Sequence, residues 1–239
     1  MALILNIETS TAVCSAALTE GEEVLFEQHS FEGPSHASLL GVYVEQAIQW
    51  AKQQGRSLDA VAVSSGPGSY TGLRIGVSVA KGLCFGAGIP LISVPTLSLL
   101  AATAVRKMQG ATDYRYCAMI DARRMEVYAA LFDASLQPIR TAMADIVDAQ
   151  TYANYLAEGK VCFFGDGAAK CQSVITDANA HFLPDVYPLA AEMAPLSAQA
   201  FADKRFEDVA YFEPFYLKEF QATIAKNKVL ESAKKEGMA

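Results

Sequence analysis

The residues best suited to chemistry lie in a glycine-rich segment between residues 61 and 88. The short apolar run Val61-Ala62-Val63 is typical of a buried strand. It stops at the turn signal Gly66-Pro67-Gly68, and a helix with a hydroxyl cap is expected to begin at Ser69 or Thr71. A strand, a glycine turn and a helix direct backbone N–H groups and the positive end of the helix dipole towards one point. The segment therefore predicts an anion-binding geometry, although many such turns hold only water.

Other polar residues follow predicted strands and could face the same anion. Glu8 ends the first predicted strand, and Asp121 and Arg123 end a matching strand later in the chain. Asp121 and Arg123 could contact a phosphate, or they could form a pair that only shapes the turn. The candidate anion-binding or nucleotide-binding residues are Glu8, Gly68, Ser69, Thr71, Arg74, Asp121 and Arg123.

Common nucleotide, metal and hydrolase motifs do not occur around these residues. No G-K-[S/T] follows the glycine turn, and Thr71 stands where a dinucleotide fingerprint requires its third glycine. The three histidines are His29, His36 and His181, and no H-x-x-x-H or H-E-x-x-H spacing occurs. We therefore expect no metal site and no catalytic residue. The sequence leaves open whether a Ser–His–Asp triad assembles in the tertiary structure.

The helix predicted from residue 72 to residue 88 is apolar on more than one face. Its expected core face holds Leu73, Val77, Ala80, Cys84 and Ala87. The opposite face holds Ile75, Val79, Gly82 and Gly86. Glycine inside a helix costs about 1 kcal/mol relative to alanine. Close approach of another helix over Gly82 and Gly86 would offset this cost. That helix could belong to the same domain or to a second protein, and both interpretations stay open.

The helix predicted from residue 36 to residue 53 has the same two-faced character. Its core face is expected to hold Leu40, Tyr43, Val44, Ala47, Ile48 and Ala51. Leu39, Val42 and Trp50 form a separate apolar stripe. A second apolar stripe on an otherwise soluble domain favours a partner surface.

The composition of the 239 residues indicates a soluble globular protein that does not bind nucleic acid or membranes by itself. The hydrophobic content of 52% supports a large core, and the net charge of −7 disfavours anionic partners. Five cysteines form no C-x-x-C pair and are expected to be buried free thiols in a reducing compartment. Neither a signal peptide nor a membrane span is visible. The predicted location is cytoplasmic.

The order of the predicted elements indicates an α/β chain in two halves. Strands are expected at 3–7, 13–18 and 23–30, then a helix, a strand at 61–65 and a further helix. The order β-β-β-α-β-α occurs again later, in degraded form. This repetition favours an actin-like ATPase architecture of two ribonuclease-H-like domains that face a cleft. The expected divisions are 1–110, 111–217 and a tail at 218–239.

Three segments together carry a specific resemblance to a known family. They are Ile7-Glu8-Thr9-Ser10, the glycine segment from Gly66 to Gly76, and the run from Ile120 to Tyr128; Tyr216-Leu217-Lys218 adds to them. With these segments the chain resembles the bacterial TsaB (YeaZ) family, over most of residues 3–218. The resemblance implies an actin-like fold and membership of the complex that adds threonylcarbamoyl to the adenosine beside the tRNA anticodon. In that family TsaB is the non-catalytic partner of a homologous enzyme, TsaD, and an ATPase, TsaE, is the third member.

Departures from the enzymes of this superfamily agree with a non-catalytic role. The catalytic relatives carry two metal-ligating histidines on a helix that corresponds to the one beginning here at His36, and this chain has Leu40 at the i+4 position. Actin-like ATPases usually carry aspartate where this chain has Glu8. The alternative function is an ATPase or small-molecule kinase that acts alone. Whether ATP or ADP binds at the interface of the assembled complex stays open.

The resemblance also implies how the two-faced helices are used. Helices 36–53 and 72–88 would form an intermolecular four-helix bundle with the matching helices of TsaD, or with a second copy of the chain when TsaD is absent. The expected interface residues are His36, Leu39, Val42, Tyr43, Trp50, Gly72, Ile75, Val79, Gly82 and Gly86.

Overall fold

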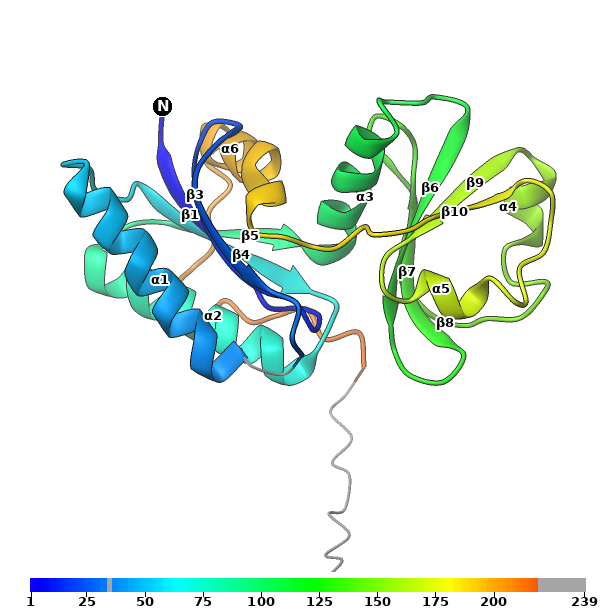
Figure 1. Cartoon of the computed structure of the whole chain (residues 1–239), viewed down its shortest axis with the longest axis horizontal. Coiled ribbons are helices and arrows are strands. Elements are labelled where there is room, and N and C mark those ends of the chain that lie inside the picture. The colour runs from blue at the N-terminus through cyan, green and yellow to red at the C-terminus, as the bar shows by residue number, and fades with distance from the viewer. Residues whose placement is uncertain (34–35, 219–239) are drawn as a thin grey trace, which may run out of the picture.

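Two five-stranded sheets form the body of the chain in the computed structural model, which describes residues 1–33 and 36–218 (Figure 1). The first sheet has the order β3-β2-β1-β4-β5, and its strands are β1 (Leu3–Glu8), β2 (Cys14–Glu20), β3 (Glu23–Ser30), β4 (Ala60–Gly66) and β5 (Leu91–Pro95). The second has the order β10-β9-β6-β7-β8, and its strands are β6 (Tyr114–Asp121), β7 (Glu126–Phe132), β8 (Pro138–Ile146), β9 (Lys160–Phe164) and β10 (Ala180–Leu183).

The two sheets repeat one topology. In the first, β1 pairs antiparallel with β2 and parallel with β4. In the second, β6 pairs antiparallel with β7 and parallel with β9. Numbered by chain order within each half, both sheets run 3-2-1-4-5. The predicted actin-like architecture of two ribonuclease-H-like units is therefore confirmed.

The helices of the second unit are shorter than those of the first. Helices α1 (His36–Gln53) and α2 (Tyr70–Ala87) each have 18 residues, whereas α4 (Ala153–Ala157) has 5 and α5 (Ala168–Cys171) has 4. Just before α4, the Asp148 carboxylate accepts hydrogen bonds from the Gln150 N–H and the Thr151 hydroxyl. Such local side-chain bonds compete with helix formation.

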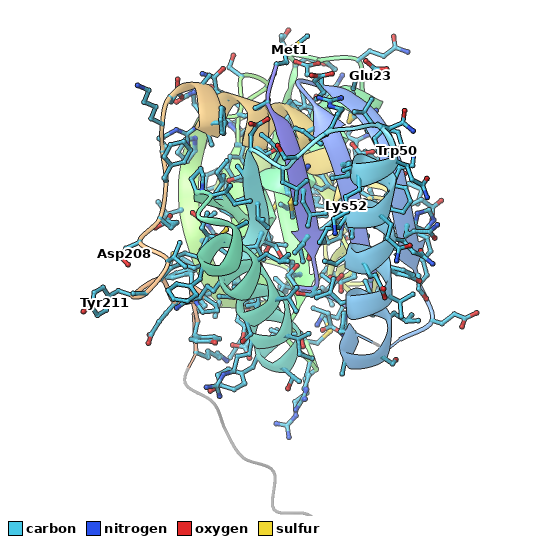
Figure 2. All side chains as sticks on the ribbon, turned by 90° about the vertical axis from the view of Figure 1, so that its left-hand side faces the viewer. Met1, Glu23, Trp50, Lys52, Asp208 and Tyr211 are labelled. Carbon is cyan, nitrogen blue, oxygen red and sulfur yellow. The ribbon has the colours of Figure 1, made fainter. Side chains whose placement is uncertain are left out.

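Helices α1 and α2 cover one face of the first sheet and lie side by side on the outside of the molecule (Figures 1 and 2). The predicted apolar stripes face the sheet except at Ala87, which is exposed at the end of α2. The buried residues are Leu40, Val44, Ala47 and Ala51 in α1 and Leu73, Val77, Ala80 and Cys84 in α2. Tyr43 and Ile48 are only partly buried at the edge of this core. All five cysteines are buried, as predicted, and unpaired.

Helix α3 (Thr96–Lys107) lies between the two sheets and joins their cores (Figure 1). Leu99 packs with residues of the first sheet such as Ile4. Leu100 and Ala104 pack with residues of the second sheet such as Tyr116. Because opposite sides of one helix fill both cores, α3 ties the relative position of the two units to its own packing. Within the part of the chain that the structure describes, no helix is long and apolar enough to cross a membrane.

After the second sheet the chain returns to the first unit. The 3-10 helix η1 (Ala191–Met193) contacts β2, and α6 (Ala194–Ala202) contacts β1 and β5. The predicted division at residue 110 falls between α3 and β6, and it stays a prediction. Within the range predicted for the second unit, residues 191–202 contact strands of the first sheet, and the predicted end of this unit at residue 217 also stays a prediction.

Residues 205–218, here called the strap, run along the first unit beside α2. The Glu207 backbone forms a bridge with Leu91, and its carboxylate accepts a hydrogen bond from the Ser93 hydroxyl. The Lys81 ammonium donates to the carbonyl oxygens of Ala210 and Phe212, at 3.2 and 2.9 Å. At its far end the strap reaches the second unit, where Lys218 forms an ion pair with Glu126. The remaining residues of the predicted tail, 219–239, lie outside the described residues.

Candidate functional site

The glycine segment packs against the turn that follows β1. A Cβ atom added at Gly68 would lie 2.3 Å from the carbonyl oxygen of Ser10, and one at Gly72 would lie 2.0 Å from that of Thr9. At Gly76 it would lie 2.3 Å from the Thr9 hydroxyl oxygen. These distances are too short for any side chain. Glycine is therefore required at all three positions because the turn and α2 approach so closely.

Several N–H groups at the start of α2 already have acceptors within the protein. Ser69 caps the helix, because its hydroxyl accepts a hydrogen bond of 3.2 Å from the Gly72 N–H. The Ser69 N–H donates to the carbonyl oxygen of Ser10 at 2.6 Å. Carbonyl oxygens of the turn thus lie against the glycine loop, where a phosphate would need N–H donors. This arrangement leaves fewer N–H donors for a phosphate at the loop than the sequence pattern indicates, and the predicted anion site stays a prediction.

Glu8 is fully buried at the end of β1. One of its oxygens accepts a hydrogen bond from the Ser10 N–H, and the other has no partner among the described residues. The hydroxyl oxygens of Ser10 and Ser64 are also buried and without a hydrogen-bond partner there. Desolvation raises the pKa of Glu8 from 4.5 to about 7, and the hydrogen bond from the Ser10 N–H opposes this shift only in part. A carboxyl that is buried and half protonated near neutral pH is poorly suited to recruiting a hydrated Mg²⁺ ion.

The matching turn of the second unit is held by its own ion pair. Asp121 pairs with Lys170 and accepts a hydrogen bond of 2.8 Å from the Arg123 N–H. Asp166 accepts the Asp121 N–H at 3.0 Å. Asp121 therefore shapes the turn through the backbone of Arg123 and through Lys170. The Arg123 side chain is exposed, and its residue adopts a left-handed φ of 72°.

The structure brings only some of the predicted anion-site residues together. Glu8, Gly68 and Ser69 meet at the turn after β1, whereas Asp121 and Arg123 meet at the turn after β6. Arg74 and Thr71 are exposed on α2, and the Arg74 guanidinium donates to the Tyr70 hydroxyl at 3.0 Å. In the described ranges no hydrogen bond or ion pair joins the two turns directly.

The strap is the part of this region that sequence reasoning missed. The Phe215 N–H donates to the Ser65 carbonyl at 2.7 Å, next to the glycine loop. The ring of Tyr216 lies 4.7 Å from that of Tyr70 at the start of α2. The motif Tyr216-Leu217-Lys218 was the available signal, because a tyrosine followed by a leucine is unusual at the start of a polar tail.

The outer face of α1 and α2 carries several exposed or partly exposed apolar residues, and we call it the α1–α2 face (Figure 2). Val42 is 46% exposed, and Leu39, Tyr43 and Trp50 are partly exposed. On α2, Ile75 and Val79 are partly exposed, and a Cβ atom at Gly82 or Gly86 would meet nothing within 4 Å. Among residues 1–33 and 36–218, then, nothing packs over Gly82 or Gly86.

Two predicted interface residues lie inside the chain and not on this face. His36 is 7% exposed, and its Nε2 lies 3.0 Å from the carbonyl oxygen of Val13. Gly72 is buried against Thr9. Sequence reasoning also missed Phe85, which is 84% exposed on α2. Its position, 60° around the helix from Gly82 at 100° per residue, was a readable signal.

Neither metal nor triad chemistry is visible in the described residues. No group of three or more His, Cys, Asp or Glu side chains could hold a metal ion there. His29 contacts Glu27, His36 contacts a backbone carbonyl, and His181 packs edge-on against Tyr114. In the described part of the chain none of these histidines bonds to a serine hydroxyl.

Comparison with known proteins gives a consistent set of relatives. Residues 31–226 match the family model described as TsaD, tRNA N6-adenosine threonylcarbamoyltransferase. The chain is 31% identical to the tRNA threonylcarbamoyladenosine biosynthesis protein TsaB of Escherichia coli, over 90% of this chain and 94% of that protein. It is 38% identical to the tRNA N6-adenosine threonylcarbamoyltransferase of Geobacillus kaustophilus, but over only 38% of this chain and 31% of the enzyme.

Two solved structures also match most of this chain. A Pseudomonas aeruginosa protein, described as similar to peptidase YeaZ, has a TM-score of 0.77 and 26% identity, and the match covers 91% of this chain and all of that one. A second structure, YeaZ from the same organism, has a TM-score of 0.74 with the same identity and coverage.

Proposed function

This chain belongs to the TsaB (YeaZ) family of tRNA threonylcarbamoyladenosine biosynthesis proteins, and on that premise we propose that it is a non-catalytic scaffold of the threonylcarbamoyl-transfer machinery. It binds the catalytic subunit TsaD through the α1–α2 face and thereby enables the ATPase TsaE. When TsaD is absent, two copies of the chain pair through the same face.

One observation carries the proposal: the open glycine stripe on α2. Gly82 and Gly86 lie inside an 18-residue helix, where each costs about 1 kcal/mol relative to alanine. Neither is required by packing within the part of the chain that the structure describes, because a Cβ atom at either position would meet nothing there within 4 Å. A helix of a partner can approach the backbone closely there. Val42 and Phe85 then supply exposed apolar area beside the contact.

The catalytic subunit is the favoured partner because it is a relative of this chain. The similarity to a threonylcarbamoyltransferase over part of its length supports a related domain in both proteins. Two related domains can present the same pair of helices to each other, as two copies do in a twofold dimer.

The alternative, an ATPase or kinase that acts alone, has less support. The glycine loop is filled by the turn after β1, and Glu8 is buried with a pKa raised to about 7. ATP hydrolysis by the purified chain at a rate abolished by Arg123→Ala would favour this alternative instead.

The substitution Gly82→Leu tests the scaffold directly. We expect the monomer to keep or gain stability, by less than about 1 kcal/mol, because leucine is the better helix former. Association with TsaD, or with a second copy, should weaken about ten- to a hundredfold, because the added side chain overpacks a close helix contact. Affinity is measured by calorimetry or sedimentation, and stability by chemical denaturation.

Two matched variants control the experiment. Gln199→Leu places a leucine at an exposed position of α6, on the other face of the first sheet. It should leave association unchanged. Gly82→Ala adds one carbon and should have a smaller effect than leucine. If Gly82→Leu binds TsaD as tightly as the original chain does, the partner does not use this face.

A further inference from the structure

A cavity of about 430 Å³ lies between the two units, away from the α1–α2 face. Its walls are Thr11–Val13 from the turn after β1, Phe31 after β3, Asp166 after β9, and Tyr187 and Pro188 from the segment that returns to the first unit. Cavities of this size hold small organic molecules. Because both units contribute walls, any bound molecule would contact both.

Two aromatic rings form one side of this cavity. The centroids of Phe31 and Tyr187 are 5.1 Å apart, with an angle of 65° between the rings. Phe31 is 50% exposed and Tyr187 is 36% exposed, so both rings have free surface. His29 supports Phe31 from behind, at a centroid distance of 5.2 Å. Exposed rings in an edge-to-face pair offer a surface for a flat, apolar ligand.

The charged group of the lining is acidic. The Asp166 Oδ1 accepts the Asp121 N–H at 3.0 Å, and its Oδ2 has no hydrogen-bond partner among the described residues. Burial raises the pKa of the Asp166 carboxyl above its ordinary value, and the charge of Lys170 opposes this shift only in part. Lys170 is itself paired with Asp121 and with the Glu126 carbonyl. Of the residues that the structure describes, no lysine or arginine lines the cavity. The wall therefore offers one free carboxylate oxygen to a donor.

We propose that this cavity binds a small planar organic cation, such as an amidine or a protonated amino-heterocycle. The ring of the ligand lies against Phe31 and Tyr187, where a cation is also attracted to the ring faces. Its N–H groups donate to Asp166 Oδ2, in a charge-assisted hydrogen bond. Anions of the same shape are excluded, because they would meet the carboxylate. Binding connects the two units and does not involve the α1–α2 face.

Three compounds of nearly equal shape test the charge requirement: benzamidine (cationic), benzamide (neutral) and benzoate (anionic). Each is titrated into the isotopically labelled full-length chain, and amide resonances are followed. Benzamidine should bind in the millimolar range and shift resonances of residues 11–13, 31, 166 and 187. It should bind about tenfold or more tightly than benzamide, as expected for one charge-assisted hydrogen bond. Benzoate should not shift these resonances.

Substitutions identify the groups responsible. Asp166→Asn keeps the Oδ1 acceptor for the Asp121 N–H, so the turn is retained, and it should lower benzamidine affinity about tenfold, to the level of benzamide. Asp177→Asn is the matched control. Its carboxylate also accepts a backbone N–H, from Asn179 at 2.8 Å, and Asp177 does not line the cavity. Tyr187→Leu should weaken benzamidine and benzamide alike.

Three results would overturn the proposal. The first is no shift of these resonances with benzamidine at millimolar concentrations. The second is equal binding of benzoate and benzamidine. The third is unchanged benzamidine affinity in Asp166→Asn while the spectrum of that variant remains folded.

Discussion

The buried carboxyl of Glu8 leads to a prediction about stability and pH. Its pKa is about 7 in the folded chain, against an ordinary value of 4.5. A group whose pKa is raised by folding contributes stability that is fully present below the unfolded pKa and is lost as the pH rises through the folded pKa. The wild-type chain should therefore lose stability between pH 4.5 and pH 7 on account of this one group.

The size of this effect follows from the shift in pKa. At about 1.36 kcal/mol for each pKa unit, a shift of roughly 2.5 units corresponds to about 3 kcal/mol in total. Between pH 5.5 and pH 8.5 the part that is lost is about 2 kcal/mol. Glu8→Gln removes the titration. It keeps an oxygen that can accept the Ser10 N–H and adds N–H donors beside the unpartnered hydroxyl oxygens of Ser10 and Ser64.

Urea denaturation of both chains between pH 5.5 and pH 8.5, followed by circular dichroism, measures the difference. We expect Glu8→Gln to gain about 2 kcal/mol relative to wild type as the pH rises over this range. Glu22→Gln, at an exposed position of the same unit, should show no such trend. A stability difference between wild type and Glu8→Gln that does not change with pH would refute the argument, because Glu8 would then be ionised throughout.

The remaining predictions concern the glycine segment, the strap, the second turn and metal binding. Gly72→Ala should destabilise the chain by about 1–3 kcal/mol in chemical denaturation, because its Cβ would lie 2.0 Å from the Thr9 carbonyl oxygen. Gly82→Ala should instead stabilise the chain by up to about 1 kcal/mol, and equal effects of the two substitutions would contradict the assigned packing. Lys81→Met removes both hydrogen bonds to the strap, so limited proteolysis within residues 205–218 should become faster; an unchanged cleavage rate would mean that other contacts hold the strap. Arg123→Ala should weaken nucleotide binding by the assembled complex if its turn holds an anion, and unchanged affinity in calorimetry would remove Arg123 from that site. The purified chain should bind Zn²⁺ no better than surface carboxylates do, and stoichiometric metal that is lost in His36→Ala would contradict this.

Much of this protein could be read from local sequence patterns. Period-two and helical apolar patterns located the first three strands and helices α1 and α2, because each element buries one face regardless of what lies further along the chain. The repeated order of elements was enough to predict the actin-like architecture. The outward stripe of Gly82 and Gly86 was also visible, since a helix with one core face must present the opposite face elsewhere.

Other features depended on tertiary packing. The glycines of the loop looked like a phosphate cradle, yet Gly68, Gly72 and Gly76 are required because Thr9 and Ser10, about sixty residues earlier in the chain, pack against them. The sequence predicted that His36 contacts a partner, whereas in the folded chain its Nε2 contacts the Val13 carbonyl oxygen. The raised pKa of Glu8 and the cavity beside Asp166 likewise come from burial and from distant segments meeting. Sequence patterns describe which side of an element is buried, whereas only the folded chain decides which atoms fill the space beside it.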